Sequence, residues 1–532
     1  MKLKPLSLAF NFVMIGLLSS CTSPSSLQWE NEQQHALKKA AYLFSKGSLK
    51  NGPYYQHPES HFSPIEIHRM SEHYLNEIKA SDSMSKREIS ALMDVSNFKR
   101  WQSVFNGRPE NLPLSIQKKI NQSRKKKALP LLDGKSNLDA LLKAMASQRD
   151  AHTHYIPATI AEKFNQSMYQ YAKGLGISLR DTKRGAEVVS IHPKGPSAEQ
   201  SSLKMGDVIE AYEADNQNRN SWVQYPFSLN DFSQYMEESL GRKIQLKVIR
   251  KNQSLIVSVT PKKFNDNQDE IKLFQEQWED RPVDRLQLSF LYQSSEDSPS
   301  FTQDLAQRLS TDSKRLKVLD MRNCRGGSVE EAADAASLFT SKTPVFQIKG
   351  KNNSFEAFEN RHSDYVHLNN VQIWIGPRTI SACEILAQAI KETHPSTTII
   401  GWPSFGKGTI QNRIPLAESS KDIGEAWVTL YETWGPGKQH SIQENGVLPT
   451  CRFEGDPSKL YGERAYPNYL KSSDENPPLP SLLQEIPVYS SPDGFQWNSS
   501  ENTALPVWRA AGLSAIQGQC SQLHSSPTNP RE

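Results

Sequence analysis

A lysine between two glycines, Gly406-Lys407-Gly408, stands out in the second half of the chain. It follows an apolar run, residues 397–402, that predicts a buried strand. Lysine is seldom buried without a partner, and the flanking glycines let other groups approach closely. Desolvation lowers the pKa of an amine, and a lysine held neutral in this way is a base. The motif therefore indicates base catalysis, provided that the chain also offers a nucleophile.

Ser381 is the candidate nucleophile. It opens an amphipathic helix predicted over residues 381–392, and Glu384 follows it by three positions. Taken locally, this pair is better read as a capping box at the start of the helix than as part of an active site. Cys383 is a rival nucleophile, but no histidine accompanies it in a recognisable motif. The choice between a structural and a catalytic serine therefore depends on the rest of the chain.

The start of the chain indicates export. Two lysines precede an apolar run, residues 6–18, that is too short and too interrupted to span a membrane. Leu18-Ser19-Ser20-Cys21 then resembles the lipobox of bacterial lipoproteins, which implies lipidation of Cys21. Thr22 after it implies release to the outer membrane. We expect a lipid-anchored envelope protein on the periplasmic face of that membrane, with a plain signal peptide as the alternative.

Charge and metal-ligand spacing exclude other classes of protein. A net charge of +4, from 62 basic and 58 acidic residues, indicates no nucleic-acid partner, and the basic run 124–127 is read as a solvated helix end or loop. The remaining cysteines lack the spacing of a zinc site, although an exported chain can form disulfides. His152 and His154 are better explained as a polar domain junction than as metal ligands. We expect neither a metal nor another cofactor.

Periodicity divides the mature chain into regions. Residues 21–160 are predicted to be helical, with helices over 33–44, 65–79, 86–101 and 138–148, and residues 170–263 to be rich in strands. Residues 280–455 are predicted to alternate strands, among them 316–320, 371–375 and 397–401, with helices. Residues 456–532 are rich in Pro, Ser and Asn, with one helix predicted over 505–513 and no assigned role. The fold class is therefore α/β within a multidomain chain that is α+β overall.

The second region resembles a PDZ domain. Its Gly174-Leu175-Gly176-Ile177 turn matches the carboxylate-binding loop of that family, and a Pro-Ser-Ala and a Lys-Met-Gly-Asp segment follow in the family's order. The resemblance implies that N–H groups of the turn capture the C-terminal carboxylate of a peptide, which adds a strand to the sheet. The alternative is a small β-rich domain with ordinary turns.

Behind this domain, characteristic segments occur in one order: Asp320–Ser328, Ser381–Ile385, Phe405–Gln411 and Gly446–Pro449. Together they resemble the carboxyl-terminal processing, or tail-specific, serine peptidases of family S41, over about residues 150–450. The Ser-Ala-x-Glu-Ile and Phe-Gly-Lys-Gly-Thr pair is specific to that family. The resemblance implies a crotonase-like α/β peptidase core, preceded by a PDZ-like domain and an N-terminal helical domain.

The resemblance also assigns roles to single residues. Ser381 takes the position of the nucleophile, Lys407 that of the general base, and Gln411 that of the polar residue that orients the lysine. Backbone N–H groups of Ala382 and of the Gly326-Gly327 turn would form the oxyanion hole. A helix N-terminus has unpaired N–H groups that suit a developing oxyanion. The capping and catalytic interpretations therefore place Ser381 in the same location.

The turn opposite Lys407 departs from the family pattern. Cys324 and Arg325 stand where the family commonly has Asn and Gly, and Cys383 replaces a serine. The resemblance implies that Cys324 and Cys383 lie near one another. Two free thiols are the simpler expectation, and a disulfide that narrows or distorts the oxyanion region is the alternative. Arg325 is expected to point to solvent rather than to bind a substrate carboxylate.

Two functions are consistent with these features. The first is a membrane-anchored serine endopeptidase that recognises exposed C-termini of envelope proteins and cuts upstream, alone, as a homo-oligomer or with an adaptor protein. The second is a non-catalytic, peptide-binding lipoprotein on an altered peptidase fold. The Cys324-Arg325 departure motivates the second, whereas the intact Ser381, Lys407 and Gln411 favour the first. Motifs of metallopeptidases, phosphate-binding loops and α/β-hydrolase elbows are absent from the sequence.

Overall fold

The computed structural model describes residues 149–453, apart from short gaps, and parts of residues 35–147 and 462–520. The gaps within the longest part are 217–218, 266–269, 296–298, 310–313, 351–353, 362–370, 395, 418–421 and 439. The predicted export signal and Cys21 lie outside the described residues, as does the helix predicted over 86–101 except for Trp101. No helix of the described part is long and apolar enough to cross a membrane.

The described residues form two compact units, one made of residues 1–43, 61–145 and 415–423 and the other of the remainder. The first unit contains helices α2 (Pro64–Glu77) and α7 (Gly134–Ala146), near two of the positions that periodicity predicts. The Tyr74 hydroxyl on α2 donates to Asn137 Oδ1 on α7 at 2.6 Å, and the Tyr74 ring packs edge-on against Trp101. The Lys143 amine on α7 also donates to Glu77 on α2 at 2.9 Å, so polar contacts and an aromatic cluster hold these helices together.

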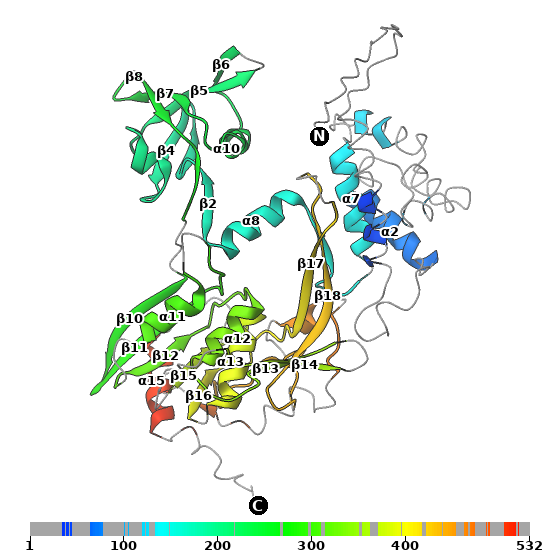
Figure 1. The fold of residues 1–532 in the computed structure, drawn as a ribbon, viewed down its shortest axis with the longest axis vertical. Coiled ribbons are helices and arrows are strands. Elements are labelled where there is room, and N and C mark those ends of the chain that lie inside the picture. Colours follow the sequence, from blue (N-terminus) through cyan, green and yellow to red (C-terminus); the bar gives the residue numbers. More distant parts are fainter. Residues whose placement is uncertain are drawn as a thin grey trace, which may run out of the picture. The chain divides into compact units, whose positions relative to one another are not determined.

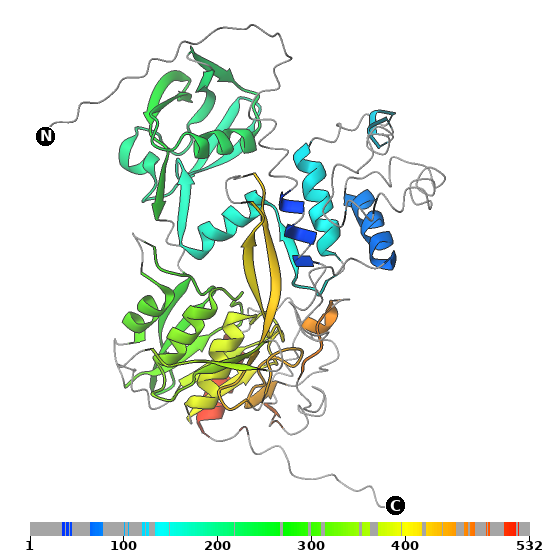
Figure 2. The same cartoon turned by 45° about the vertical axis from the view of Figure 1, so that its right-hand side comes forward.

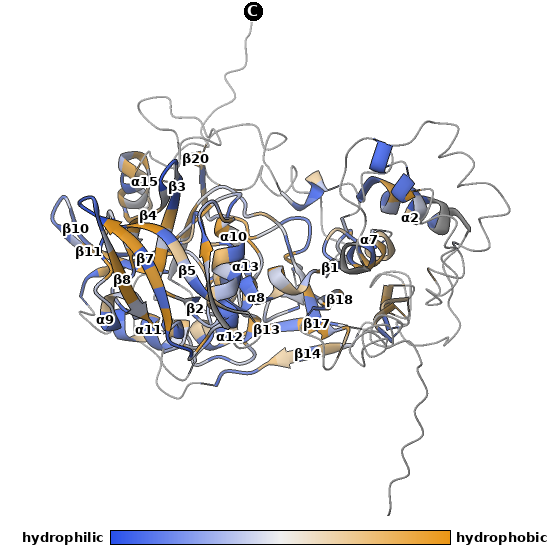
Figure 3. Ribbon diagram, turned by 90° about the horizontal axis from the view of Figure 1, so that it is seen from above, coloured by the Kyte–Doolittle hydropathy of each residue, from blue (hydrophilic) through white to orange (hydrophobic). Residues whose placement is uncertain are grey.

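The second unit includes a small β-rich domain with the predicted order of elements. A six-stranded sheet has the order β3-β4-β5-β7-β8 with β6 on β5, and β2 pairs with β9. Figure 3 shows the hydrophobic and hydrophilic residues that alternate along β7, so one face of this sheet is buried. Phe232 and Met236, one turn apart on α10, pack on that face. The elements are β2 (Tyr171–Gly174), β3 (Ile177–Thr182), β4 (Gly185–Ile191), α9 (Pro196–Gln200), β5 (Val208–Asn216), β6 (Arg219–Gln224), α10 (Leu229–Glu238), β7 (Ile244–Arg250), β8 (Gln253–Val259) and β9 (Lys262–Asn265).

The core of the second unit is a seven-stranded sheet with helices on both faces (Figure 1). Its strands, in spatial order, are β10 (Ile271–Trp278), β11 (Arg281–Leu288), β12 (Leu316–Asp320), β15 (Val371–Ile375), β16 (Thr397–Gly401), β19 (Cys451–Phe453) and β20 (Val488–Tyr489). All neighbours are parallel except β10 and β11. The helices are α11 (Phe301–Leu309), α12 (Val329–Ser337), α13 (Ala382–Thr393) and α15 (Leu505–Ile516). Strands β12, β15 and β16 coincide with the predicted ranges.

Alternation along these strands explains why both faces are covered. Ile373 on β15 packs with α11, α12 and α13 on one face, whereas its neighbour Trp374 packs with α15 on the other. A parallel strand that is buried on both faces reads as a nearly continuous apolar run, which is why the sequence pattern located these strands well even though Lys317 and Gln372 are buried within them. The α12 helix begins at an N-cap, Ser328, whose hydroxyl accepts a hydrogen bond from the Glu331 N–H.

A second, five-stranded sheet was not predicted. It consists of β1 (His154–Ile156), β13 (Phe346–Lys349), β14 (Phe355–Phe358), β17 (Thr409–Pro415) and β18 (Glu425–Trp434). Figure 2 shows the long hairpin that β17 and β18 form. The segment read as a polar junction, residues 150–155, enters this sheet because β1 pairs with β18. Helix α8 (Ala158–Met168) follows β1, and a short 3-10 helix, η5 (Glu463–Ala465), lies in the C-terminal region.

The C-terminal region completes the second face of the seven-stranded sheet. Trp508 on α15 is fully buried, and its ring packs against Phe453 and Trp374 at centroid distances of 4.7 and 5.5 Å. The Arg322 guanidinium lies over the Trp508 ring at 4.9 Å. A disulfide joins Cys451 on β19 to Cys520 beyond α15. The tail therefore contributes a helix to the hydrophobic core.

We expect Trp508→Ala to destabilise the second unit by about 3–5 kcal/mol, because it leaves a large cavity and removes the ring that stacks on Arg322. Urea denaturation followed by intrinsic fluorescence measures the loss. Trp222, which is 38% exposed, supplies the control, since Trp222→Ala should change stability by less than about 0.5 kcal/mol. Equal effects of the two substitutions would show that α15 is not part of this core.

Candidate active site

Ser381 stands in a strained turn at the N-terminus of α13. It occupies the N-cap with φ 58° and ψ −122°, a conformation that L-residues rarely adopt and that is often found at functional sites. Its hydroxyl makes no capping hydrogen bond. Instead, the Glu384 N–H donates to the Ser381 carbonyl oxygen at 2.7 Å. The predicted capping-box position is therefore correct, and the hydroxyl is left available at the edge of a cleft.

The carboxylate of Glu384 ties this turn to the lysine loop. It is fully buried and accepts hydrogen bonds from the N–H groups of Ser381 at 2.7 Å, Gly406 at 2.6 Å and Lys407 at 3.0 Å. The Ser404 hydroxyl donates to it as well, at 2.6 Å. Burial raises the pKa of Glu384 to about 7, although these four donors oppose the rise. One side chain thus sets the position of the Ser381 turn relative to the Lys407 loop.

The amine of Lys407 lies in the cleft that Ser381 also lines, a cavity of about 640 Å³. It donates to the Thr409 carbonyl oxygen at 3.0 Å and to Gln411 Oε1 at 2.7 Å. Burial lowers the pKa of Lys407 to about 8, against the opposing charges of Glu463, Glu384 and Asp150. A neutral amine that donates two hydrogens to these oxygens keeps its lone pair for a third partner.

The glycines around Lys407 are required by close contacts. A Cβ at Gly408 would collide with the backbone of Gln443, whose side-chain oxygen accepts from the Gly408 N–H at 2.9 Å. Gly406 has φ 93° and faces the backbone of Glu444. The loop therefore holds its lysine between two backbone contacts, as the sequence motif suggested.

The turn opposite the lysine carries a disulfide. Cys324 and Cys383 are bonded to each other, so the expectation of two free thiols was wrong. The Cys383 sulfur also accepts from the Gly326 N–H at 3.1 Å. A Cβ at Gly326 would come within 3.1 Å of the Ser381 Cβ, so only glycine fits against Ser381 without displacing it.

Two backbone N–H groups remain near Ser381 without an acceptor among the residues that the structure describes. One belongs to Ala382, the first residue of α13, and the other to Gly327. Gly327 lines the cleft. Its N–H is left without an acceptor because Leu291, beside it, donates to the Gly326 carbonyl and accepts from the Ser328 N–H. These two groups are the candidates for the oxyanion hole, whereas the Gly326 N–H is occupied by sulfur. Arg325 is 66% exposed and lies 3.5 Å from Glu270.

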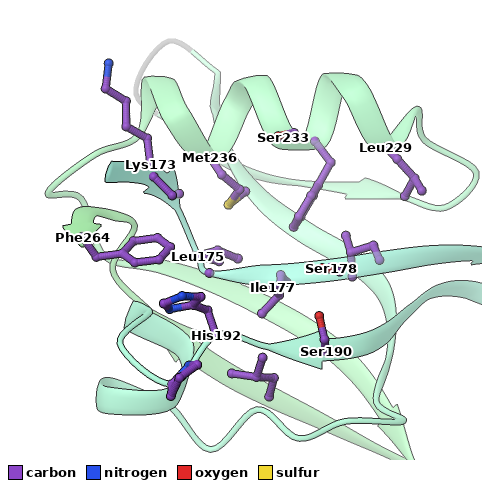
Figure 4. Close-up of a pocket in the computed structure, with 17 residues that line it drawn as sticks. Lys173, Leu175, Ile177, Ser178, Ser190, His192, Leu229, Ser233, Met236 and Phe264 are labelled. Atoms are coloured by element: carbon purple, nitrogen blue, oxygen red, sulfur yellow. The ribbon is translucent and has the colours of Figure 1, made fainter. Parts of the chain in front are cut away.

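The β-rich domain offers a separate groove of about 630 Å³ between β3 and α10 (Figure 4). Leu175 and Ile177 line one side, and Met236 lines the helical side. At its end the predicted carboxylate loop has Gly174 and Gly176 at positive φ, and the N–H groups of Leu175 and Gly176 have no acceptor within the described part of the chain. The groove therefore offers N–H donors at one end and an apolar wall beside them.

His152 and His154 lie near Lys407 and have protein partners of their own. No group of three metal-ligating side chains occurs in the described residues. His152 Nε2 pairs with Glu463 at 2.7 Å. His154, on β1, has its pKa lowered to about 4 by burial and by the neighbouring charges of His152 and Lys407. The two histidines therefore lie among the titratable groups that surround Lys407.

Comparison with known families agrees with this arrangement. Residues 288–453 match the model of peptidase family S41, and residues 174–260 match that of the PDZ domain. The chain carries an S41 peptidase domain. The family resemblances that the sequence motifs indicated are thereby confirmed, and the fold is a mixed α/β architecture with a PDZ domain before the S41 domain.

Relatives of this chain carry matching names. The tail-specific protease of Haemophilus influenzae is 25% identical over 339 residues, which are 62% of this chain and 47% of that protein. The carboxy-terminal-processing protease of Bartonella bacilliformis is 26% identical over 365 residues, 65% of this chain and 77% of that protein. The chain thus spans about half the length of the first relative. Among solved structures, a photosystem II D1 C-terminal processing protease matches with 18% identity and a TM-score of 0.35, covering 72% of this chain and 92% of that one. The family assignment rests on the sequence matches.

Sequence reasoning missed part of the S41 site. Thr409 and Thr429 accept hydrogen bonds from the Gln411 amide, and Asp150 accepts from Thr429. Thr409 belongs to the Phe-Gly-Lys-Gly-Thr motif but was given no role, and no motif included Thr429. Glu384 was noted only as a helix cap. The available signal was the Asp-x-His-Thr run at residue 150, which was read as a junction. The linking strands β17 and β18 were not predicted, so their side chains could not be placed beside the lysine.

We expect Glu384→Gln to reduce peptide cleavage by about 10²-fold with little change in KM. An amide would turn a hydrogen-bond donor toward N–H groups that need an acceptor, which displaces Ser381 relative to Lys407. Steady-state kinetics on an unstructured peptide measures the effect. Glu331→Gln is the matched control, because Glu331 is also buried and accepts from the Thr302 N–H and hydroxyl. Wild-type kcat in Glu384→Gln would contradict the positioning role.

Proposed function

We propose that this protein is a serine endopeptidase that uses Ser381 as nucleophile and Lys407 as general base. The observation that carries the proposal is the environment of the Lys407 amine. It is desolvated, two of its hydrogens are held by the Thr409 carbonyl and the Gln411 amide, and it shares a cleft with Ser381. A serine hydroxyl needs a base within reach, and an amine with a pKa near 8 accepts protons readily at neutral to mildly alkaline pH.

In the proposed reaction, Lys407 takes the proton of the Ser381 hydroxyl while the oxygen attacks the scissile carbonyl carbon. The N–H groups of Ala382 and Gly327 stabilise the oxyanion that forms. Lys407 then returns the proton to the departing amine, and the peptide carbonyl stays on Ser381 as an ester. Water, deprotonated by the same lysine, hydrolyses that ester. Gln411 keeps the amine oriented through both steps.

Substrate delivery is proposed to use the PDZ domain. Its groove combines free N–H groups at the Leu175-Gly176 turn with apolar side chains, which suits a C-terminal carboxylate with an apolar last residue. Relatives named tail-specific and carboxy-terminal-processing proteases support substrates that are recognised through their C-termini. The predicted lipidation of Cys21 would hold the enzyme at the envelope side of a bacterial membrane, and an adaptor or a second copy remains part of this proposal.

We expect Ser381→Ala and Lys407→Ala each to abolish cleavage of an unstructured C-terminal peptide, with a loss of about 10³-fold or more, while the fold is retained. Chromatography of cleavage products measures the loss, and circular dichroism checks the fold. Lys391→Ala is the control, because the Lys391 amine is also buried but donates to the Leu448 carbonyl away from the cleft. Undiminished cleavage in either dyad variant would overturn the mechanism.

The pH dependence follows from the lowered pKa of Lys407. The base must be neutral, so kcat/KM should rise with pH and level off above an apparent pKa near 8, falling about tenfold per unit below it. Ionisation of Glu384, with a pKa of about 7, acts in the same direction because its carboxylate must accept backbone hydrogens. A profile measured from pH 5 to 10 that is flat, or that falls as pH rises through 8, would exclude a neutral lysine as base.

One observation favours the second candidate function, a peptide-binding protein without turnover. The Gly326 N–H is engaged by the Cys383 sulfur, which removes one backbone donor from the oxyanion region. Casein turnover assayed with and without reductant separates the two. Binding of a C-terminal peptide without turnover in both conditions supports the binder, and turnover in either supports the peptidase.

A further inference from the structure

The Gln411 amide beside Lys407 has all of its hydrogen-bonding groups engaged. Its NH₂ group donates to the hydroxyl oxygens of Thr409 at 3.0 Å and Thr429 at 3.2 Å, and its oxygen accepts from Lys407 at 2.7 Å. An amide can be turned by half a rotation at little steric cost, which would exchange its oxygen and nitrogen. In that orientation an NH₂ group would face the lysine amine and could not accept from it. Something must therefore fix the direction of the amide.

The Asp150 carboxylate, which reaches Gln411 through Thr429, sets the orientation of the amide. The Thr429 hydroxyl has one hydrogen, and it donates this hydrogen to Asp150 Oδ1 at 2.8 Å. A carboxylate only accepts, so the Thr429 oxygen is left as an acceptor toward Gln411. The amide must then present its NH₂ group to Thr429 and its oxygen to Lys407. The chain of bonds has a single consistent direction from the lysine to the carboxylate.

Asp150 is well fixed for this task. Its Oδ1 also accepts from the N–H groups of His152 and Thr153, both at 3.0 Å, and the residue is buried. The Thr153 hydroxyl in turn accepts from the Thr429 N–H at 3.0 Å, which joins the two segments by a second bond. Asp150 therefore cannot rotate away from Thr429 without breaking bonds to its own turn.

We propose that Asp150 and Thr429 are positioning residues for the general base: they act through Gln411 to hold its amide oxygen against Lys407. This inference rests on the proposed function of Lys407 as a base. It extends the site to Asp150, which lies 279 residues before Thr429 in the sequence. Thr429 orients the Gln411 amide and carries no charge. Asp150 orients Thr429 and also places a negative charge near the Lys407 amine.

The charged groups that face Lys407 come from several elements. Glu384 lies on α13, Glu463 on η5, and Asp150 in the turn before β1, and all three favour the protonated amine. His154 on β1 also interacts with the lysine, and His152 is paired with Glu463. Removal of the Asp150 charge therefore subtracts one of three carboxylates that hold the pKa of Lys407 up, and leaves the other two in place.

The test compares Thr429→Val, Thr429→Ser, Asp150→Asn and Gln411→Ala by the pKa of Lys407 and by kcat. The pKa is read from the acid limb of the kcat/KM profile and, independently of turnover, from the ¹³Cε NMR titration of the lysine signal that is lost in Lys407→Arg. Thr393→Val is the control, because Thr393 is also buried and its hydroxyl donates to the Ala389 carbonyl of its own helix.

We expect Thr429→Val to lower kcat about tenfold at unchanged KM and to lower the pKa of Lys407 by about half a unit or more, since the released amide no longer holds the protonated amine. Thr429→Ser keeps a hydroxyl and should behave like the wild type. Asp150→Asn should move the acid limb to lower pH, because a carboxylate charge is lost. In a Gln411→Ala background, Thr429→Val should have no further effect.

Three results would overturn the proposal: a wild-type kcat and lysine pKa in Thr429→Val, equal loss in Thr429→Ser, or a loss that adds in full to that of Gln411→Ala. If Ser381→Ala retains full cleavage, the proposed function fails instead, and the NMR titration still decides whether the chain of bonds acts on Lys407. A lower melting temperature with an unchanged lysine pKa would show that Thr429 and Asp150 only stabilise the fold.

Discussion

The buried carboxylate of Glu384 is the interaction on which the rest of the site depends. It accepts from the backbone of Ser381 on one side and from the backbone of Gly406 and Lys407 on the other. An unpaired carboxylate in such a place would be costly, so burial and hydrogen bonding must be achieved together. The same bonds that satisfy this charge also determine how the nucleophile's helix meets the lysine loop. A requirement of stability thereby becomes a constraint on catalytic geometry.

The supporting sheet keeps this junction rigid. Strands β15 and β16 lead directly into the Ser381 turn and the lysine loop, and both are buried on two faces. The C-terminal helix α15 covers the face away from α13, where the Arg322 guanidinium lies over the rings of Trp374 and Trp508. A tail of no evident role in sequence thus belongs to the hydrophobic core beneath the site.

The oxyanion turn shows how this chain differs from the pattern of its family. A covalent bond between Cys324 and Cys383 joins the turn to the first turn of α13, and the sulfur takes up the Gly326 N–H. The donors left near Ser381 are those of Ala382 and Gly327. The disulfide gives the turn a covalent link to α13, and the function that we propose relies on the next glycine along the turn.

The sequence alone determined the elements whose pattern is local. Strands 316–320, 371–375 and 397–401 were located because strands buried on both faces are mostly apolar. Ser381, Lys407 and Gln411 were named through motifs that resemble family S41. Only the tertiary structure decided which cysteines pair, which backbone N–H groups remain free, and that β1 and β18 bring Asp150 and Thr429 behind Gln411. These features depend on contacts between segments far apart in the chain, in strands that are short and of mixed polarity, and no periodicity within a single segment records its partner.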